Sequence, residues 1–193
     1  MTFTSAITGK TKIGRWRVKY GTYTNDSGSV GGDINTGLGN VLAVFLQKTG
    51  AATTTDLPVV NESLPHIAGS AISIVTKADE TGLWIAFEGQ VRDSYATADA
   101  ESTIIDVSRS DGKIYVLGSI TEGGDGAVAL DLTPALNKIE ALFLQPLDTA
   151  VSSDAPVVNE TFPVPANQSG CVTLATVTSK SYLFLAIGTR GGT

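Results

Sequence analysis

The chain has 193 residues, of which 42% are hydrophobic and 17% are charged, so its composition is typical of a globular protein and excludes a disordered one. Its formal net charge of −6 opposes binding to nucleic acid, because an acidic protein repels a polyanion. The longest apolar runs, such as Leu42–Leu46 and Leu183–Ile187, are far shorter than the roughly 20 residues that span a bilayer, so we expect no membrane contact.

The first predicted element is a strand at residues 15–20, where charged residues alternate with apolar ones. This alternation predicts an apolar face made of Trp16, Val18 and Tyr20. The opposite, basic face is made of Arg15, Arg17 and Lys19. We interpret the element as an edge strand whose charges face solvent or a partner, and which protects the sheet from unwanted pairing.

Further strands are predicted where β-branched and apolar residues cluster between turn residues. In the first half of the chain they are Val41–Gln47, Ala71–Thr76 and Leu83–Phe87, and in the second half Lys113–Leu117, Ile139–Gln145, Cys171–Thr176 and Leu183–Ile187. Turns are predicted at Asn25–Gly28 and Glu122–Gly126. Residues 133–140 hold the one candidate helix, because Pro134 suits a first helical position, but the two glycines in Thr36–Asn40, its counterpart, weigh against it.

An internal repeat is the strongest feature of the sequence. Phe45-Leu46-Gln47 recurs as Phe143-Leu144-Gln145, and Pro58–Glu62 recurs as Pro156–Glu160. Asp33–Pro65 and Asp131–Pro163 share 14 identities over 33 ungapped positions, where chance supplies about two. A period close to 100 residues is that of a domain rather than of a solenoid unit. The sequence therefore predicts an internal duplication.

The predicted architecture is all-β, with two tandem antiparallel β-sandwich domains that are jelly-roll-like. The expected bounds are 1–97 for the first copy, 98–107 for a linker rich in small and acidic residues, and 108–193 for the second copy. Met1–Ser5 lacks a basic segment followed by an apolar one, so no secretory signal is expected.

Residues that could carry catalysis or bind a metal are few. The chain has one histidine, His66, and one cysteine, Cys171, which excludes an intramolecular disulfide and leaves little for a triad or a transition-metal site. We interpret His66 as a loop residue and Cys171 as a small side chain within a strand. Asp33 and Asp131, which the repeat aligns, are interpreted as local turn acceptors rather than an acid–base pair.

The duplicated Asn61-Glu62 and Asn159-Glu160 leave two interpretations open. They are either repeated ligands for a sugar or calcium, or corner residues whose side chains satisfy backbone groups, and we favour the second. The acidic loop Glu122–Gly126 lacks the regular spacing of a calcium-binding loop. The glycines at 28, 31 and 32 do not form a phosphate loop. We therefore expect no catalytic residues, no cofactor-binding residues and no metal ligands.

Two stretches of the first copy resemble the small β-structured virion proteins of tailed phages and related viruses. They are Lys19–Asp26 with Gly31–Leu38, which leads into the strand at Val41, and the terminal strand Gly82–Gly89 with Trp84 at its centre. The second copy departs from both patterns. The resemblance implies a non-enzymatic capsid decoration or minor virion protein, which assembles in the host cytoplasm and contacts other virion proteins as a homo-oligomer.

The alternative function is a carbohydrate- or receptor-binding β-sandwich of the fibre or knob type. Sugar sites often pair an exposed aromatic ring with Asn or Asp, and Tyr23 beside Asn25-Asp26, or Tyr95, are the candidates. This alternative implies a glycan as a partner of the protein.

Overall fold

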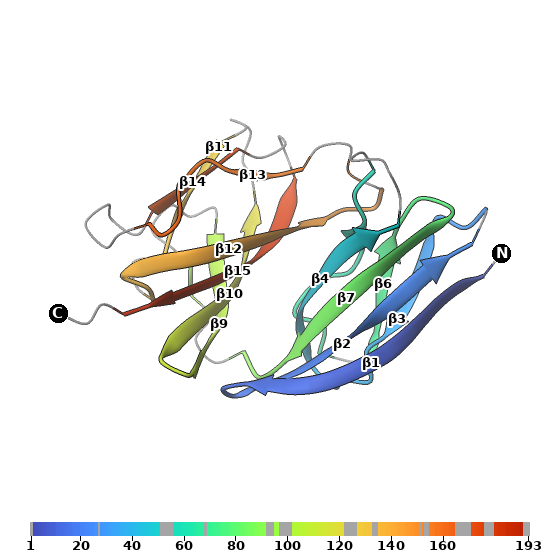
Figure 1. Ribbon diagram of the computed structural model, residues 1–193, viewed down its shortest axis with the longest axis horizontal. Helices are drawn as coiled ribbons and strands as arrows, with labels where there is room; N and C mark the ends of the chain where they lie inside the picture. Colours follow the sequence, from blue (N-terminus) through green and yellow to red (C-terminus); the bar gives the residue numbers. More distant parts are fainter. Residues whose placement is uncertain are drawn as a thin grey trace. The chain divides into compact units, whose positions relative to one another are not determined.

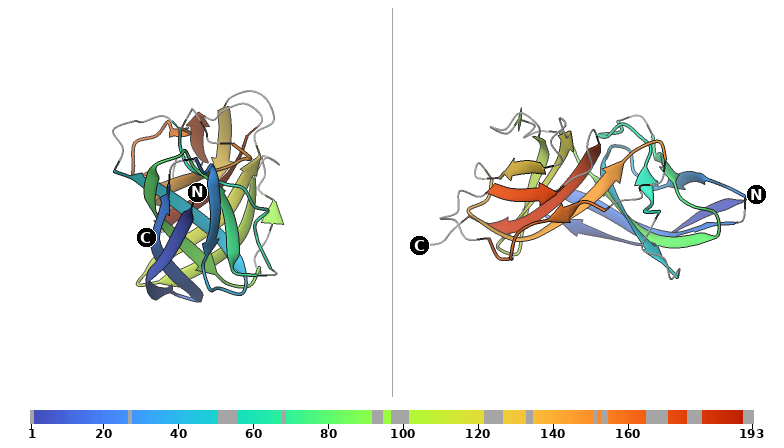
Figure 2. Two further views of the ribbon diagram at one scale, coloured as in Figure 1. Left: turned by 90° about the vertical axis from the view of Figure 1, so that its right-hand side faces the viewer. Right: turned by 90° about the horizontal axis from the view of Figure 1, so that it is seen from above.

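The computed structural model describes residues 2–26, 28–50, 56–67, 69–91, 95–96, 102–121, 127–132, 135–150, 152, 155–164, 171–175 and 180–190. For residues 95–96, 127–129 and 171 it describes the backbone alone. Strands account for every regular element in this part of the chain, and no helix occurs in it (Figure 1, Figure 2). The prediction of an all-β protein is therefore confirmed.

The strands divide between two compact units, which we call unit 1 and unit 2. Unit 1 consists of Met1–Lys12, Trp16–Gln90 and Gln145–Ala155, and unit 2 of Ile13–Arg15, Val91–Leu144 and Pro156–Thr193. The segment Gln145–Ala155 thus belongs to unit 1, although it comes from the second half of the sequence.

In unit 1, strands β1, β2, β7 and β4 lie side by side in that order, and β3, β6 and β5 lie side by side in a second set (Figure 1). Their bounds are β1 Phe3–Ile13, β2 Trp16–Asn25, β3 Gly31–Asn35, β4 Val41–Thr49, β5 Val59–Val60, β6 Ala71–Val75 and β7 Glu80–Glu88. The pairings of β7 with β2 and β4, and of β6 with β3 and β5, are antiparallel.

In unit 2, the order β9, β10, β15, β12 is accompanied by the order β11, β14, β13. Their bounds are β8 Tyr95–Ala96, β9 Ser102–Ser110, β10 Lys113–Thr121, β11 Ala127–Asp131, β12 Lys138–Leu147, β13 Val157–Val158, β14 Cys171–Ala175 and β15 Ser181–Thr189. β8 pairs with the outer side of β9. The last residues of β12, from Gln145, belong to unit 1.

The two units repeat one strand order and closely similar packing. In unit 1, Gly21 of β2 pairs with Trp84 of β7, and the indole ring covers the glycine. In unit 2, Gly118 of β10 pairs with Phe184 of β15, whose ring covers that glycine in the same way. Each glycine is needed because a side chain at either position would overlap the ring.

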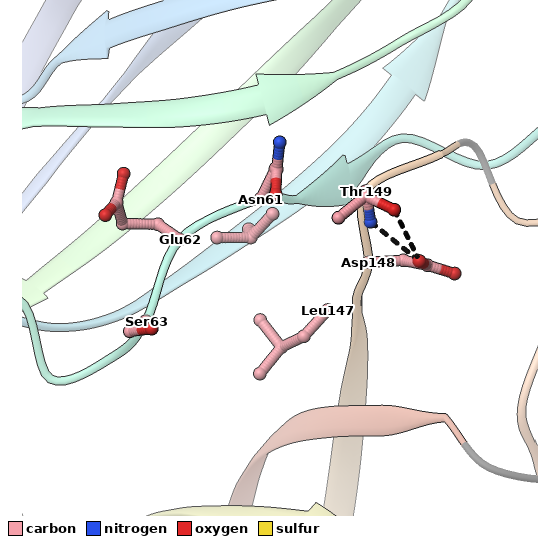
Figure 3. Close-up of a pocket in the computed structure, with 7 residues that line it drawn as sticks. Asn61, Glu62, Ser63, Leu147, Asp148 and Thr149 are labelled. Carbon is pink, nitrogen blue, oxygen red and sulfur yellow. Dashed lines mark hydrogen bonds between the residues drawn. The ribbon is translucent and has the colours of Figure 1, made fainter.

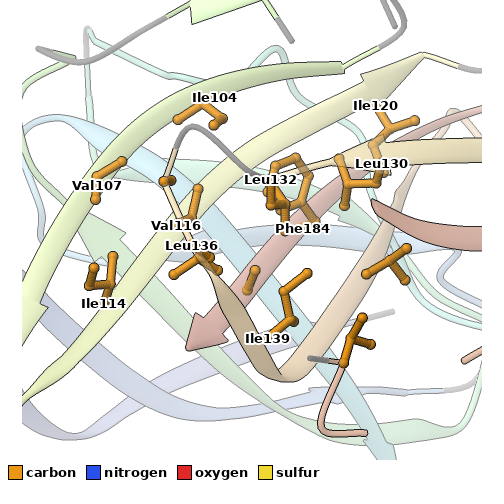
Figure 4. Packing of buried hydrophobic residues seen from close by; sticks show 14 of the residues in the cluster. Ile104, Val107, Ile114, Val116, Ile120, Leu130, Leu132, Leu136, Ile139 and Phe184 are labelled. Atoms are coloured by element: carbon orange, nitrogen blue, oxygen red, sulfur yellow. The ribbon is translucent and has the colours of Figure 1, made fainter. Parts of the chain in front are cut away.

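Each unit has its own hydrophobic core, to which both of its sets of strands contribute. In unit 1, Trp84 and Ala86 of β7 cluster with Ile72 and Ile74 of β6 and with Val60 of β5. In unit 2, the cluster is formed mainly by aliphatic side chains around Phe184 (Figure 4). Its labelled members are Ile104, Val107, Ile114, Val116, Ile120, Leu130, Leu132, Leu136, Ile139 and Phe184.

Two features of the strands differ from the sequence interpretation. β1 covers the outer side of β2, so the basic strand is not the edge of its sheet. Residues 102–107, assigned to the linker, lie in β9, where Ile104 is buried in the core of unit 2. β1 was missed because most of its side chains are exposed and small or charged, and its place is fixed by backbone pairing.

The segment considered for a helix contains a turn and a strand. The N–H groups of Ala135 and Leu136 both donate to the carbonyl of Leu132, at 3.0 and 2.8 Å, and β12 begins at Lys138. Residues 133–134 lie outside the described part.

Candidate functional site

The duplicated Asn-Glu motif forms a corner at the end of a short strand in each unit, β5 in unit 1 and β13 in unit 2. The N–H of Asn61 donates to the carbonyl of Ser73 at 2.9 Å, and the N–H of Asn159 donates to the carbonyl of Thr173 at the same distance. The same backbone hydrogen bond therefore forms at the bend of each unit.

The glutamates at these corners have different neighbours. Glu160 accepts the N–H of Thr173 at 3.3 Å, as the corner interpretation requires. Glu62 instead lies 3.5 Å from Nδ1 of His66. The two acids are therefore equivalent in position and different in contacts.

The corner in unit 1 borders a shallow pocket of about 330 Å³ (Figure 3). Its lining combines Val60–Ser63 with Leu147–Thr149, and none of these described residues is aromatic. Asp148 Oδ1 accepts the N–H of Thr149 at 2.6 Å, so this oxygen already has a donor. Figure 3 shows the Glu62 and Asp148 carboxyl groups pointing to different sides of the pocket. The pocket offers separate polar groups rather than one convergent set.

His66 and Cys171 occupy strand-like positions. The backbone of His66 bridges to Val41, and the backbone of Val164 bridges to Ile139 at the equivalent place in unit 2. Cys171 is the first residue of β14, opposite Asp131, and its side chain lies outside the described residues. Within the described residues, no three His, Cys, Asp or Glu side chains gather where they could hold a metal ion.

The alignment of Asp33 with Asp131 is wrong. Asp33 pairs with Ser73 and accepts its hydroxyl hydrogen bond at 2.8 Å. Asp131 pairs with Cys171, the position that Asn35 occupies opposite Ala71 in unit 1. The ungapped alignment fails here because the connection from β11 to β12 is longer than the one from β3 to β4, and the turn after Leu132 accommodates the extra residues.

Tyr23 is not available to stack on a sugar. Its side chain is 1% exposed and belongs to the core of unit 1, and Asn25 beside it is equally buried. Burial, with the negative charge of Glu80, raises the pKa of the Tyr23 hydroxyl above its ordinary value. The other candidate, Tyr95, lies in β8, and its side chain is outside the described residues, as is the whole loop Glu122–Gly126.

The predicted basic residues bind protein groups, Arg15 in unit 2 and Arg17 and Lys19 of β2 in unit 1. Arg15 forms an ion pair with the buried Asp106 of β9. Arg17 Nε lies 2.8 Å from Glu88 Oε2, and Lys19 Nζ donates to the carbonyl of Gly37 at 2.7 Å. In unit 1, an open pocket of about 490 Å³ is lined by Lys10–Lys12, Arg17–Lys19 and Leu38.

One face of the unit 1 sheet carries exposed apolar side chains that the sequence interpretation missed. Trp84 and Ala86 point into the core, so Leu83 and Ile85, which alternate with them, point to the opposite face. Ile85 pairs with Tyr20 on one side and with Phe45 on the other, so these side chains share that face. We call Tyr20, Phe45, Leu83 and Ile85 the apolar strip.

On this face of the sheet, exposure increases along β7 from Phe87 toward Leu83. Phe87 is buried between Trp16 and Phe45, whose ring centroids lie 5.8 and 5.9 Å from its own. Tyr20 is 41% exposed and Leu83 is 48% exposed. Tyr20 was expected to lie with the buried Trp16 and Val18, and it does share their face, but that face is open at its position. The signal available in the sequence was the run Leu83–Phe87, which is apolar on both faces of its strand.

Comparisons with protein-family models, with curated proteins and with solved structures found no match to this chain. No helix in the described residues is long and apolar enough to cross a membrane.

Proposed function

We propose that this protein is a non-enzymatic structural component of a virion, most closely a capsid decoration or minor virion protein, and that it acts through protein–protein surfaces. The observation that carries the proposal is the apolar strip. Leu83 and Tyr20 are held by paired strands and are exposed to solvent, and exposed apolar groups that share one rigid face are typical of interaction surfaces.

We also propose that each unit is a jelly-roll-like β-sandwich and that the two arose by internal duplication. The common strand order and the repeated Gly–aromatic pairs, Gly21 with Trp84 and Gly118 with Phe184, support this history. Two related units on one chain would present related surfaces twice, which raises avidity on a particle whose sites are suitably spaced.

The experiment that tests the role is binding to purified particles from the virus that encodes the chain, measured by co-sedimentation. We expect Leu83→Lys to abolish co-sedimentation, because it places a charge in the strip. Val30→Lys is the matched control, since Val30 is 77% exposed and lies outside the strip, and it should bind like the native protein. Native protein that stays in the supernatant contradicts the proposal.

A glycan array distinguishes the alternative class. Saturable binding to a saccharide, lost on substitution of residues in the polar pocket such as Asn61→Ala, would assign the protein to the carbohydrate-binding modules instead. The aromatic anchor expected for that class at Tyr23 is buried, so we favour the structural role.

A further inference from the structure

In unit 1, the free side of β5 is covered by the segment Gln145–Ala155. Leu147 pairs in parallel with Val60, and the N–H of Asp148 donates to the carbonyl of Val60 at 3.1 Å. Leu57 and Ser152 exchange backbone hydrogen bonds of 2.8 and 3.2 Å. The segment therefore closes an edge that would otherwise expose backbone groups.

Gln145 fixes the register of this pairing. Its side chain is 2% exposed, its Oε1 accepts the N–H of Leu46 at 2.7 Å, and its Nε2 donates to the carbonyl of Pro58 at 3.1 Å. Because both ends of a buried amide are satisfied, a shift of the segment would leave polar groups without partners. A single side chain thus ties the segment to β4 and to the residue before β5.

Unit 2 has strands equivalent to those of unit 1, but no segment among its described residues covers β13. Val157 of β13 is 57% exposed, whereas Val59, its counterpart in β5, is 0% exposed. Among the described residues, β13 is the last strand in the order β11, β14, β13. The unpaired side of β13 is therefore the equivalent of the side of β5 that Gln145–Ala155 covers.

The residue that matches Gln145 is also present, and it is exposed. Gln47 occupies the position of Gln145 in the repeated Phe-Leu-Gln motif, and its side chain lies in solvent. Its Nε2 donates to the carbonyl of Lys48 at 3.1 Å, just as Nε2 of Gln145 donates to Pro146 at 3.1 Å. Gln145 is therefore buried against unit 1, whereas Gln47 is exposed and makes the same local hydrogen bond.

We infer that a second copy of this chain supplies the missing cover. Gln47 of one chain would accept the N–H of Leu144 and donate to the carbonyl of Pro156 of another, and Thr49 would lie opposite Val158. A second copy is the expected occupant because both elements of this pairing are duplicated on the chain. β13 is the duplicate of β5, and the residues from Gln47 are the duplicate of those from Gln145. Such a contact joins two different surfaces, so it builds a closed ring or an open filament. The inference goes beyond the proposed function, because it holds whether or not the assembly belongs to a virion.

Disulfide trapping tests the contact directly. In a chain whose native cysteine is replaced by Cys171→Ser, we introduce Thr49→Cys with Val158→Cys and expect a ladder of cross-linked chains on a non-reducing gel. Leu147→Cys with Val60→Cys is the positive control, since these residues pair within the chain and should give an intrachain bond. Thr24→Cys with Val158→Cys is the negative control, with an exposed β2 residue in place of Thr49. Absence of the ladder while the positive control closes overturns the inference.

The second measurement is sedimentation velocity of chains that keep the native Cys171. Gln47→Ala removes two interchain hydrogen bonds and Val157→Lys adds a charge to the contact, so each should weaken self-association by about tenfold or more. The control Thr24→Ala should leave it unchanged. Mixing the two variants should restore dimers, because each retains the surface that the other lacks.

A native protein that remains monomeric, or variants that associate like it, overturns the inference. Neither variant alters the apolar strip. Normal binding of particles by a monomeric protein would therefore overturn the inference and leave the proposed function standing.

Discussion

At the scale of single residues, the two glycines beneath aromatic rings limit what the core strands accept. A methyl group at Gly21 would lie 2.7 Å from the Trp84 ring and would also overlap the carbonyl of Ala6. At Gly118 it would overlap the Phe184 ring and lie 2.6 Å from the carbonyl of Thr103. Neither neighbour can move freely, since the rings are buried and the carbonyls belong to neighbouring strands.

We expect Gly21→Ala and Gly118→Ala each to lower the free energy of unfolding by about 1–3 kcal/mol through overpacking. The measurement is equilibrium denaturation in urea. Gly39→Ala is the control, because its new methyl group would meet a single flexible neighbour, Glu88 Oε1 at 3.3 Å, and its effect should stay within about 0.5 kcal/mol. Equal effects at Gly39 and Gly21 would contradict this account.

The ion pair of Lys48 and Glu80 is the most buried one described. The two side chains are 8% and 3% exposed, and Glu80 also accepts the N–H of Lys77 at 3.3 Å. Removing the lysine leaves a buried carboxylate without its cation. We expect Lys48→Met to destabilise unit 1 by about 3–5 kcal/mol, measured by chemical denaturation.

Lys77→Met is the control for that measurement. Lys77 pairs with Asp56 through a side chain that is 58% exposed, so its loss should cost less than about 1 kcal/mol. The backbone N–H that Glu80 accepts is unchanged by this substitution. If the two variants unfold at the same denaturant concentration, the buried pair is not stabilising.

At the scale of elements, a polar contact joins the two strands that flank β15. Lys113 Nζ of β10 donates to both carboxyl oxygens of Glu140 of β12, at 2.8 and 2.6 Å. This hydrogen bonding lowers the pKa of Glu140, assisted by the charge of Lys113 and, to a lesser degree, that of Lys138, while desolvation opposes the shift.

We expect Lys113→Gln to raise the pKa of Glu140 toward its ordinary value, measured from the carboxyl carbon shift in an NMR titration. Because the folded pKa is lowered, the pair contributes stability above the pKa of the unfolded chain and loses it as the pH falls through the folded pKa. Lys138→Gln should change the titration less, since Lys138 Nζ lies 3.8 Å away. A larger effect at Lys138 would contradict this assignment.

The strands show which local sequence patterns are sufficient to predict a strand. Val41–Gln47 lies within β4 and Leu183–Ile187 within β15, because runs of β-branched and other apolar residues favour strands that pack against a core. β1 has few such residues, and its pairing with β2 depends on backbone groups that every sequence possesses. The pattern of apolar residues in a sequence therefore does not predict edge strands of this kind.

At the scale of the whole molecule, the repeat boundary and the folding unit differ. The sequence divides after residue 97, yet unit 1 includes Gln145–Ala155. Gln145 supplies two hydrogen bonds to this unit, and Leu147 pairs with Val60. A fragment that ends at residue 97 therefore lacks part of the fold to which its residues belong.

We expect the fragment 1–97 to unfold at a lower temperature than unit 1 of the full chain, and a synthetic peptide of residues 145–155 to restore part of the difference. Circular dichroism and calorimetric titration measure the two effects. A peptide in which Gln145→Ala is substituted is the control and should bind less tightly, because the amide loses its partners at Leu46 and Pro58. A fragment as stable as the intact unit would contradict the role of the segment.

The sequence by itself determined the all-β class and the positions of most strands, because β-branched and apolar runs between turn residues have few other solutions. It also located the paired motifs around Gln47 and Gln145. Only the tertiary structure decided which copy of each motif is covered, that Asp131 is opposite Cys171, and that Leu83 faces solvent while Trp84 is buried. Those outcomes depend on register and on what lies across each strand, and a linear pattern of side chains does not specify contacts between residues far apart in the chain.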